Sequence, residues 1–329
     1  MKVSGDGDES AAREESCHEH PQDDAFLPAP SLEEDKNSNI CTLEAASAEC
    51  SSQKAMSAGP ERGRPSHKVR WYLLVCGAAC LCYSNAPWCG FVFDDMSAVR
   101  DNRDLRPHTP LHHLFWNDFW GTPIHKEHSH KSYRPLCVLT FRINYWLHEL
   151  DPMGYHVGNV LLHIIVSAIF LRVCSMFVAE RASVVAALLF AVHPVHTEAV
   201  TGVVGRAESL SSAFFLLALI AYTHSARRWK RTRWSCLLAC VLLIAVATLC
   251  KEQGITVVGV CVIYELFVVQ QLRPRNMAHI IQTVLASKSS PPEWLRELFI
   301  RLGVLFFSAL ALLVARVKVM GAQLPVFTK

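Results

Sequence analysis

Two adjacent aspartates, Asp94 and Asp95, are the residues of this sequence best placed to act as a general base. They directly follow the apolar run 71–93, so at least one carboxylate should lie at the boundary of an apolar layer. Desolvation there disfavours the charged form and makes a carboxylate a better proton acceptor. The same spacing fits a pair of acids that only marks a helix end. Proton abstraction by this pair is therefore a hypothesis.

A second polar stretch contains His193, His196 and Glu198, with Pro194 between the histidines. The proline should end or kink the preceding helix near His193. These three residue types can bind zinc, but their spacing matches no standard zinc signature. Histidines satisfied at a membrane interface would also explain the pattern. We favour a polar site that contacts substrate, and we predict neither a metal ion nor a cofactor there.

Two further stretches pair a cation with an acid. Arg206 and Glu208 stand beside small residues at a predicted helix start, where guanidinium and backbone N–H groups could bind phosphate oxygens. An ion pair of Arg206 with Glu208 or Asp94 is the alternative. Lys251 and Glu252 present the same choice between anion binding and an ion pair.

The segment 128–135 combines hydroxyls, imidazoles and two cations. Its Lys131, Tyr133 and Arg134 could contact a sugar phosphate, although a solvated loop would have the same composition. Aromatic residues just before this segment are spaced as on one face of a short helix that could rest at a membrane surface. These residues are Phe115, Trp116, Phe119 and Trp120.

Long apolar segments separate these polar stretches and must position them. Residues 71–93 contain no charge, and a helix of that length crosses a hydrocarbon layer of about 30 Å. Further apolar segments are predicted at 153–178, 183–205, 209–223, 235–250, 254–269 and 298–315. The sequence therefore predicts an all-α, multi-pass membrane protein with about seven transmembrane helices.

The composition supports this class. Of 329 residues, 51% are hydrophobic and only 19% are charged, and the mean hydropathy is +0.21. This argues against a disordered or nucleic-acid-binding protein. Residues 1–60 differ, with 13 acids against 4 Lys and Arg. We predict a disordered acidic tail at 1–68, followed by a membrane domain at 69–329. Most of the thirteen cysteines lie in apolar runs, where a thiol acts as a small hydrophobe.

The distribution of Lys and Arg predicts the orientation. Clusters at 62–70, 227–233 and 273–275 fall on one side when the predicted spans alternate, and this side should be cytoplasmic. The N-terminus is then cytoplasmic and residues 94–152 form a lumenal loop. The acids and bases described above all gather at the lumenal face. That convergence predicts an active site there.

Several ordered blocks resemble the transmembrane and tetratricopeptide-repeat-containing protein O-mannosyltransferases. The resemblance covers about residues 70–329. Its blocks are Phe93-Asp94-Asp95, Asn117–Gly121, Ser129–Leu136, Leu189–Glu198, Val204–Glu208 and Cys250–Thr256. Together they are far more specific than any single motif.

The resemblance implies a multi-pass enzyme of the endoplasmic reticulum membrane with the multi-span, GT-C type fold. It implies dolichyl phosphate mannose as donor and Ser or Thr hydroxyls of lumenal protein segments, in cadherin-type domains, as acceptors. The acidic motif Asp94-Asp95 would be catalytic. Arg206, Lys131 and Arg134 would contact the phosphate, and Glu198, Glu208 and Glu252 would shape the site.

Family members continue beyond this region through a lumenal domain, more spans and a repeat array. Acceptor recognition by this chain could therefore be incomplete. A non-catalytic membrane component that binds partners is the alternative function. A transporter would instead place polar groups at the midplane of the membrane.

Overall fold

The computed structural model describes residues 65–226, 231–272 and 292–321. These residues belong to one compact unit, Gly63–Lys329. Residues 1–64 of the predicted tail lie outside the described part. So do Arg227, Arg228, Lys230, Arg273 and Arg275 of the basic connections. The disordered tail and the orientation rule remain predictions.

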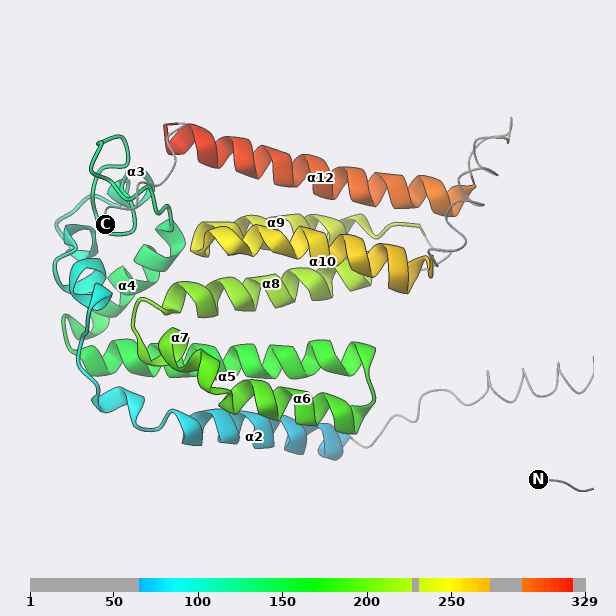
Figure 1. Ribbon diagram of the computed structural model, residues 1–329, viewed down its shortest axis with the longest axis horizontal. Helices are drawn as coiled ribbons and strands as arrows, with labels where there is room; N and C mark the ends of the chain where they lie inside the picture. Colours follow the sequence, from blue (N-terminus) through cyan, green and yellow to red (C-terminus); the bar gives the residue numbers. More distant parts are fainter. Residues whose placement is uncertain (1–64, 227–230, 273–291, 322–329) are drawn as a thin grey trace, which may run out of the picture. The chain divides into compact units, whose positions relative to one another are not determined.

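The described residues form helices and contain no strand, which confirms the all-α class. The long helices run side by side as a bundle (Figure 1). They are α2 (Pro65–Cys82), α5 (Pro152–Phe177), α6 (Glu180–Val192), α8 (Arg206–Ser225), α9 (Trp234–Cys250), α10 (Val257–Ile263) and α12 (Glu293–Val319). The 3-10 turn η5 (Glu252–Thr256) leads into α10, which continues as the π-helical turn η6 (Tyr264–Val269).

Three helical runs of the described residues are long and apolar enough to cross a membrane, namely α5, Glu252–Val269 and α12. A fourth is broken, because α6 and the run Pro194–Thr201 meet at 44°. Helix α9 is apolar but has only 17 residues. Length and composition thus support three or four spans, fewer than the seven predicted.

The predicted continuous span 71–93 is wrong in its second half. Helix α2 ends at Cys82, and the chain then forms the 3-10 turn η1 (Ala86–Trp88). Pro87 lacks the N–H group that a continuing helix would need. Phe93 has a φ of 46° and is 94% exposed. The chain therefore reaches Asp94 in irregular conformation, which frees the backbone N–H groups before it for other partners.

The break after α6 occurs where Pro194 predicts it. Helix α6 ends at Val192, and the turns η4 (Pro194–His196) and α7 (Thr197–Thr201) follow. The His193 Nδ1 atom accepts a hydrogen bond from the N–H of Val195 at 3.1 Å. Because a histidine nitrogen caps the new turn, the change in direction leaves this N–H satisfied.

The outer face of the bundle is apolar. Large hydrophobic side chains are exposed along the long helices other than α8. Examples are Leu73, Leu161, Leu189, Leu238, Ile263, Phe306 and Phe307. A surface of this kind would be unfavourable in water and suits the hydrocarbon of a bilayer.

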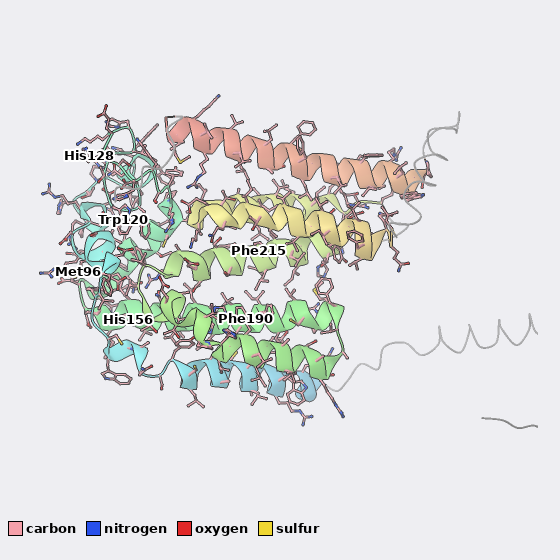
Figure 2. All side chains as sticks on the ribbon, viewed as in Figure 1. Met96, Trp120, His128, His156, Phe190 and Phe215 are labelled. Atoms are coloured by element: carbon pink, nitrogen blue, oxygen red, sulfur yellow. The ribbon has the colours of Figure 1, made fainter. Side chains whose placement is uncertain are left out.

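A cap of short elements covers one end of the bundle (Figure 1). It comprises the π-helical turn η2 (Met96–Arg100), the 3-10 turn η3 (Arg103–Leu105), α3 (His113–Trp116) and α4 (Pro135–His148). Met96, Trp120 and His128 mark this end in Figure 2. The cap lies within the predicted loop 94–152 and is an ordered structure.

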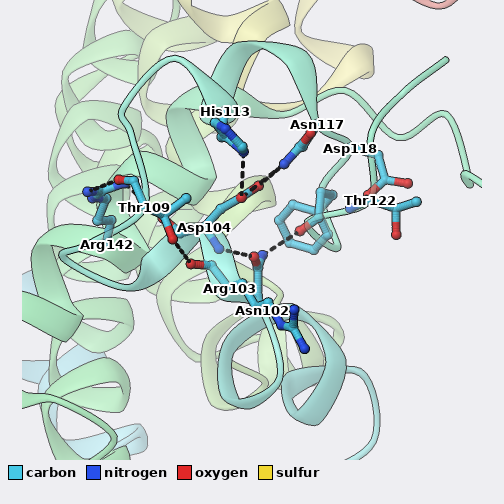
Figure 3. Close-up of polar contacts among 10 residues, drawn as sticks. Asn102, Arg103, Asp104, Thr109, His113, Asn117, Asp118, Thr122 and Arg142 are labelled. Carbon is cyan, nitrogen blue, oxygen red and sulfur yellow. Dashed lines mark hydrogen bonds and ion pairs between the residues drawn. The ribbon is translucent and has the colours of Figure 1, made fainter. Parts of the chain in front are cut away.

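Asp104 is the polar centre of the cap (Figure 3). Both of its carboxylate oxygens accept hydrogen bonds from Asn117 Nδ2 at 2.9 Å. The N–H of Asp104 donates to Asn102 Oδ1 at 2.9 Å, and His113 Nδ1 lies 4.0 Å from Asp104 Oδ1. Burial raises the pKa of the Asp104 carboxyl above its ordinary value, an effect larger than the opposing hydrogen bonds from Asn117.

The aromatic residues of the cap at 115–120 do not form the predicted helical face. Helix α3 is a single turn that ends at Trp116. Phe119 lies beyond it and is completely buried, whereas Phe115 and Trp116 are exposed. The spacing alone was misleading because Phe119 packs inward, with its ring 6.1 Å from that of Phe141 on α4.

A buried ion pair attaches α12 at the end of the bundle opposite the cap. Arg301 Nη2 and Glu265 Oε1 are 2.6 Å apart, and both side chains are almost fully buried. Tyr222 and Gln270 also donate to the Glu265 carboxylate, at 3.0 and 2.8 Å. Arg301 Nη1 donates to Thr232 Oγ1 at 3.1 Å. The pair therefore joins α8, η6 and α12.

Candidate active site

A cavity of about 290 Å³ lies where the cap meets the bundle. It is lined by Val92, Phe93, Asp94, Asp95, Arg134, Val195, Glu198, Ala199, Gly202, Val204, Gly205 and Glu208. The segment after η1, the broken helix α6–α7, the start of α8 and the residue before α4 all contribute. Five of the predicted site residues thus lie around one hollow: Asp94, Asp95, Arg134, Glu198 and Glu208.

Asp95 joins two distant segments of the chain at this cavity. Its Oδ1 accepts a hydrogen bond from the N–H of Val204 at 2.9 Å, and its Oδ2 accepts one from the N–H of Val92 at 3.2 Å. The side chain is only 2% exposed. Both oxygens are therefore occupied, and Asp95 fixes the turn before α8 against the segment after α2.

Asp94 has the opposite environment. It is exposed at the cavity, and its carboxylate has no polar partner among the described residues. A carboxylate whose oxygens are free can accept a proton from a group that enters the cavity. The two aspartates therefore differ in role, which their adjacency in the sequence could not show.

The turn that meets Asp95 depends on a close approach of two backbone segments. A Cβ atom on Gly205 would lie 2.5 Å from the carbonyl oxygen of Ala199. Only glycine fits this position, because the turn before α8 crosses directly over α7. The N–H of Val204 is thereby held where Asp95 can accept it.

Three further charged residues form a chain beside the cavity. Arg134 Nε lies 3.3 Å from Glu252 Oε2, and Arg316 Nη2 lies 2.7 Å from Glu252 Oε1. Arg316 Nη1 also donates to the carbonyl of Tyr133 at 3.2 Å. Glu252 thus holds two cations, of which Arg134 lines the cavity. Sequence reasoning missed Arg316, whose only signal was a charge near the end of an apolar segment.

Arg206 does not contact the cavity. Its guanidinium donates to Asn159 Oδ1 at 2.7 Å, to the carbonyl of Tyr155 at 2.8 Å and to Asn144 Oδ1. It also stacks over the ring of Phe141 at 4.8 Å, and the residue is only 2% exposed. Neutral oxygens on α4 and α5 thus occupy the Arg206 donors, the described residues show no ion pair of Arg206 with Glu208 or Asp94, and the phosphate contact stays a prediction that this arrangement does not favour.

Lys131 is also structural. Its ammonium group donates to the carbonyls of Ile124 and Lys126 at 2.6 and 3.0 Å, and the residue is 3% exposed. This position does not favour the predicted phosphate contact, which stays a prediction. Tyr133 is buried beside it, and burial raises the pKa of the Tyr133 hydroxyl. The described structure therefore places neither side chain in the cavity.

His193 and His196 lie outside the cavity lining. His193 caps the turn η4, whereas the His196 ring packs 4.4 Å from that of Phe190 and 5.4 Å from that of His163. Among the described residues, no group of three or more His, Cys, Asp or Glu is arranged to hold a metal ion. Of the three predicted site residues His193, His196 and Glu198, only Glu198 lines the cavity.

A second cavity of about 280 Å³ adjoins the first. It shares Glu208, which pairs with Lys251, and Lys251 lines it as well. The remaining lining is largely apolar and comes from α5, α6, α8 and η5, with Phe170, Phe190, Phe215 and Leu216 among its residues. Phe190 and Phe215 lie within the bundle in Figure 2. The charged cavity thus adjoins one that combines an ion pair with a mainly apolar wall.

Comparison with curated proteins identifies the family. Protein O-mannosyl-transferase TMTC3 of Homo sapiens is 55% identical over 256 residues, which cover 78% of this chain. The chain belongs to the TMTC family of protein O-mannosyl-transferases. Tmtc3 of Drosophila melanogaster is 49% identical over 80% of the chain, and human TMTC4 is 41% identical over 79%. The predicted family resemblance is thereby confirmed.

This TMTC-family chain is much shorter than its relatives. It covers 28% of human TMTC3, 33% of the Drosophila protein and 38% of human TMTC4. No protein-family model matches it, and no solved structure does.

Proposed function

We propose that this chain forms the catalytic cavity of a protein O-mannosyl-transferase. The donor is dolichyl phosphate mannose, and the acceptors are Ser or Thr hydroxyls of lumenal protein segments, including cadherin-type domains. One observation carries the proposal: an exposed, unpaired Asp94 shares a cavity with Arg134 in a chain 55% identical to a named mannosyltransferase.

The cavity supplies a base and a cation for the transfer. Asp94 takes the proton of the acceptor hydroxyl, and the hydroxyl oxygen forms a bond to the anomeric carbon of mannose. The bond from that carbon to the phosphate oxygen breaks, and the phosphate leaves on its lipid with the bonding electrons. Arg134 stabilises the added negative charge on this phosphate, and Arg316 holds Glu252 so that Arg134 is not fully neutralised.

The second cavity suits the lipid part of the donor. Its phenylalanine and leucine side chains provide an apolar path between α5, α6 and α8, and it shares Glu208 with the charged cavity. An isoprenoid chain would bury apolar surface there, while its phosphate reaches Arg134. This arrangement is the reason for proposing a lipid-linked donor over a soluble nucleotide sugar.

We further propose seven transmembrane helices of the GT-C type in the endoplasmic reticulum membrane, with a cytoplasmic N-terminus. Each of the seven predicted apolar segments contains a helix, although 71–93 is helical only up to Cys82 and 183–205 is broken after Val192, and the charged cavity lies at the capped end. A glycosylation sequon inserted near His128 tests the orientation, because only a lumenal loop receives the glycan. An unmodified sequon there, with a modified one at the N-terminus, would reverse the assignment.

The decisive test of the activity is rescue of O-mannosylation. Cells that lack the family's transferases would express this chain, and glycopeptide mass spectrometry would measure mannose on a cadherin-type acceptor. We expect Asp94→Asn to abolish transfer without affecting membrane insertion. Asp101→Asn is the matched control, because Asp101 is an exposed acid on the same loop outside the cavity. Full activity of Asp94→Asn would refute the base assignment, and no rescue by the unmodified chain would favour the non-catalytic alternative.

A further inference from the structure

A third cavity, the largest of those described here, has a volume of about 450 Å³ and lies at the end of the bundle opposite the cap. The start of α2, the end of α5 and the start of α6 meet there. It is lined by Lys68, Trp71, Tyr72, Leu171, Arg172, Ser175, Glu180, Ser183 and Val184. None of these residues takes part in the proposed transfer.

The cations of this cavity are not neutralised. Lys68 and Arg172 are exposed and form no ion pair with any described residue. Arg172 Nη1 makes one long hydrogen bond, to Ser175 Oγ at 3.5 Å, which leaves most of the guanidinium N–H groups free. Two cations with free donors in one hollow are suited to bind an anion.

The only acid of the lining, Glu180, keeps its charge but is outnumbered by the two cations, and one of its oxygens is occupied. Glu180 Oε1 accepts a hydrogen bond from the indole N–H of Trp71 at 2.6 Å. This contact fixes the Trp71 ring across the cavity and turns the carboxylate toward α2. Helix α6 begins here with Ala179 as its N-cap and without a side-chain cap, so its first N–H groups also favour an anion.

The rest of the lining is apolar or aromatic. Leu171 and Val184 form part of the wall, and Trp71 and Tyr72 lie at the start of α2. Tryptophan and tyrosine are typical of the level at which headgroups meet the hydrocarbon of a bilayer. A free phosphate would use only the cations, whereas a phospholipid would use both halves of the cavity.

We propose that this cavity binds the headgroup of an anionic phospholipid. Lys68 and Arg172 contact its phosphate, the Trp71 and Tyr72 rings lie against its glycerol region, and Leu171 and Val184 contact the start of its acyl chains. The bound lipid holds α2 against α5 and α6. This site is separate from the transferase cavity, and the proposal does not depend on mannose transfer.

The test is native mass spectrometry of the full chain, released from detergent with phosphatidylglycerol or with phosphatidylcholine of the same acyl chains. We expect tighter binding of phosphatidylglycerol. Lys68→Gln with Arg172→Gln should weaken it roughly thirtyfold, from the usual contribution of two cations near a lipid surface. The double variant Arg100→Gln with Arg103→Gln removes the same charge from exposed positions in the cap and should change nothing.

Two further measurements keep the result interpretable. The charge-preserving variant Lys68→Arg with Arg172→Lys should retain the preference, which separates loss of binding from misfolding. Added glycerol 1-phosphate should not displace the lipid, because it lacks the acyl chains. Displacement by this soluble phosphate, equal affinity for both lipids, or unchanged binding by the glutamine variant would each overturn the proposal.

Discussion

Arg206 offers the sharpest test of the structural assignments, because the sequence suggested a phosphate contact and the structure shows a buried connector. Its guanidinium reaches Asn159 and Asn144 and the carbonyl of Tyr155. The substitution Arg206→Lys keeps the charge but replaces a planar set of donors with a single ammonium group. Lysine at this position can satisfy only some of these oxygens.

The expected loss of stability follows from the acceptors left unpaired. Each buried acceptor without a partner costs about 1–3 kcal/mol, so two of them should reduce the free energy of unfolding by about 2–6 kcal/mol. In a unit of this size the melting temperature falls by roughly 2–4 °C for each kcal/mol. Thermal unfolding in detergent should therefore show Arg206→Lys melting roughly 4–24 °C below the unmodified protein.

Arg134→Lys is the matched comparison. Arg134 lines the cavity and is partly exposed, and its pairing with Glu252 contributes no more than about 1 kcal/mol to stability. We expect this variant to melt almost normally but to transfer mannose roughly tenfold to a hundredfold more slowly. An Arg206→Lys protein with normal melting and a raised KM for the lipid donor would refute the structural role and restore the phosphate contact.

Three other substitutions test separate parts of the structure. Gly205→Ala should abolish transfer and lower the melting temperature, because the added Cβ would lie 2.5 Å from the carbonyl oxygen of Ala199. The control is Gly77→Ala in α2, where a Cβ has open space, and it should leave transfer and melting temperature unchanged. Glu265→Gln should lower the free energy of unfolding by about 3–5 kcal/mol, since Arg301 would remain buried without its counter-charge. Replacing both residues with methionine should recover most of this loss in thermal unfolding. The raised pKa of Asp104 means that its protonated form is favoured in the folded cap, so the contribution of this one group to stability is fully present below the ordinary value of 3.8 and is lost as pH rises through the raised pKa. Asp104→Asn should remove this decline in melting curves recorded across that range, and an identical pH dependence in the variant would contradict the burial argument.

Helix positions could be predicted from the sequence because each depends on a local run of apolar residues. Helices α5, α8, α9 and α12 all lie on predicted segments, and Pro194 breaks its helix as expected. The predicted span 71–93 shows that hydropathy alone does not predict where a helix ends. Hydropathy is continuous through Phe93, but Pro87 and the contacts of Asp95 with Val92 and Val204 end the helix early.

The sequence by itself determined the all-α class and the family, because these follow from apolar length and from ordered blocks of residues, and it predicted a wider set of site residues that includes the five charged ones around the cavity. Tertiary structure decided what each charged residue does. Asp94 is free while Asp95 is bonded, Arg206 and Lys131 are buried connectors, and Arg316 lies beside Glu252 although 64 positions separate them. The physical reason is that the role of a charge depends on which oxygens and N–H groups surround it, and those come from segments distant in the chain.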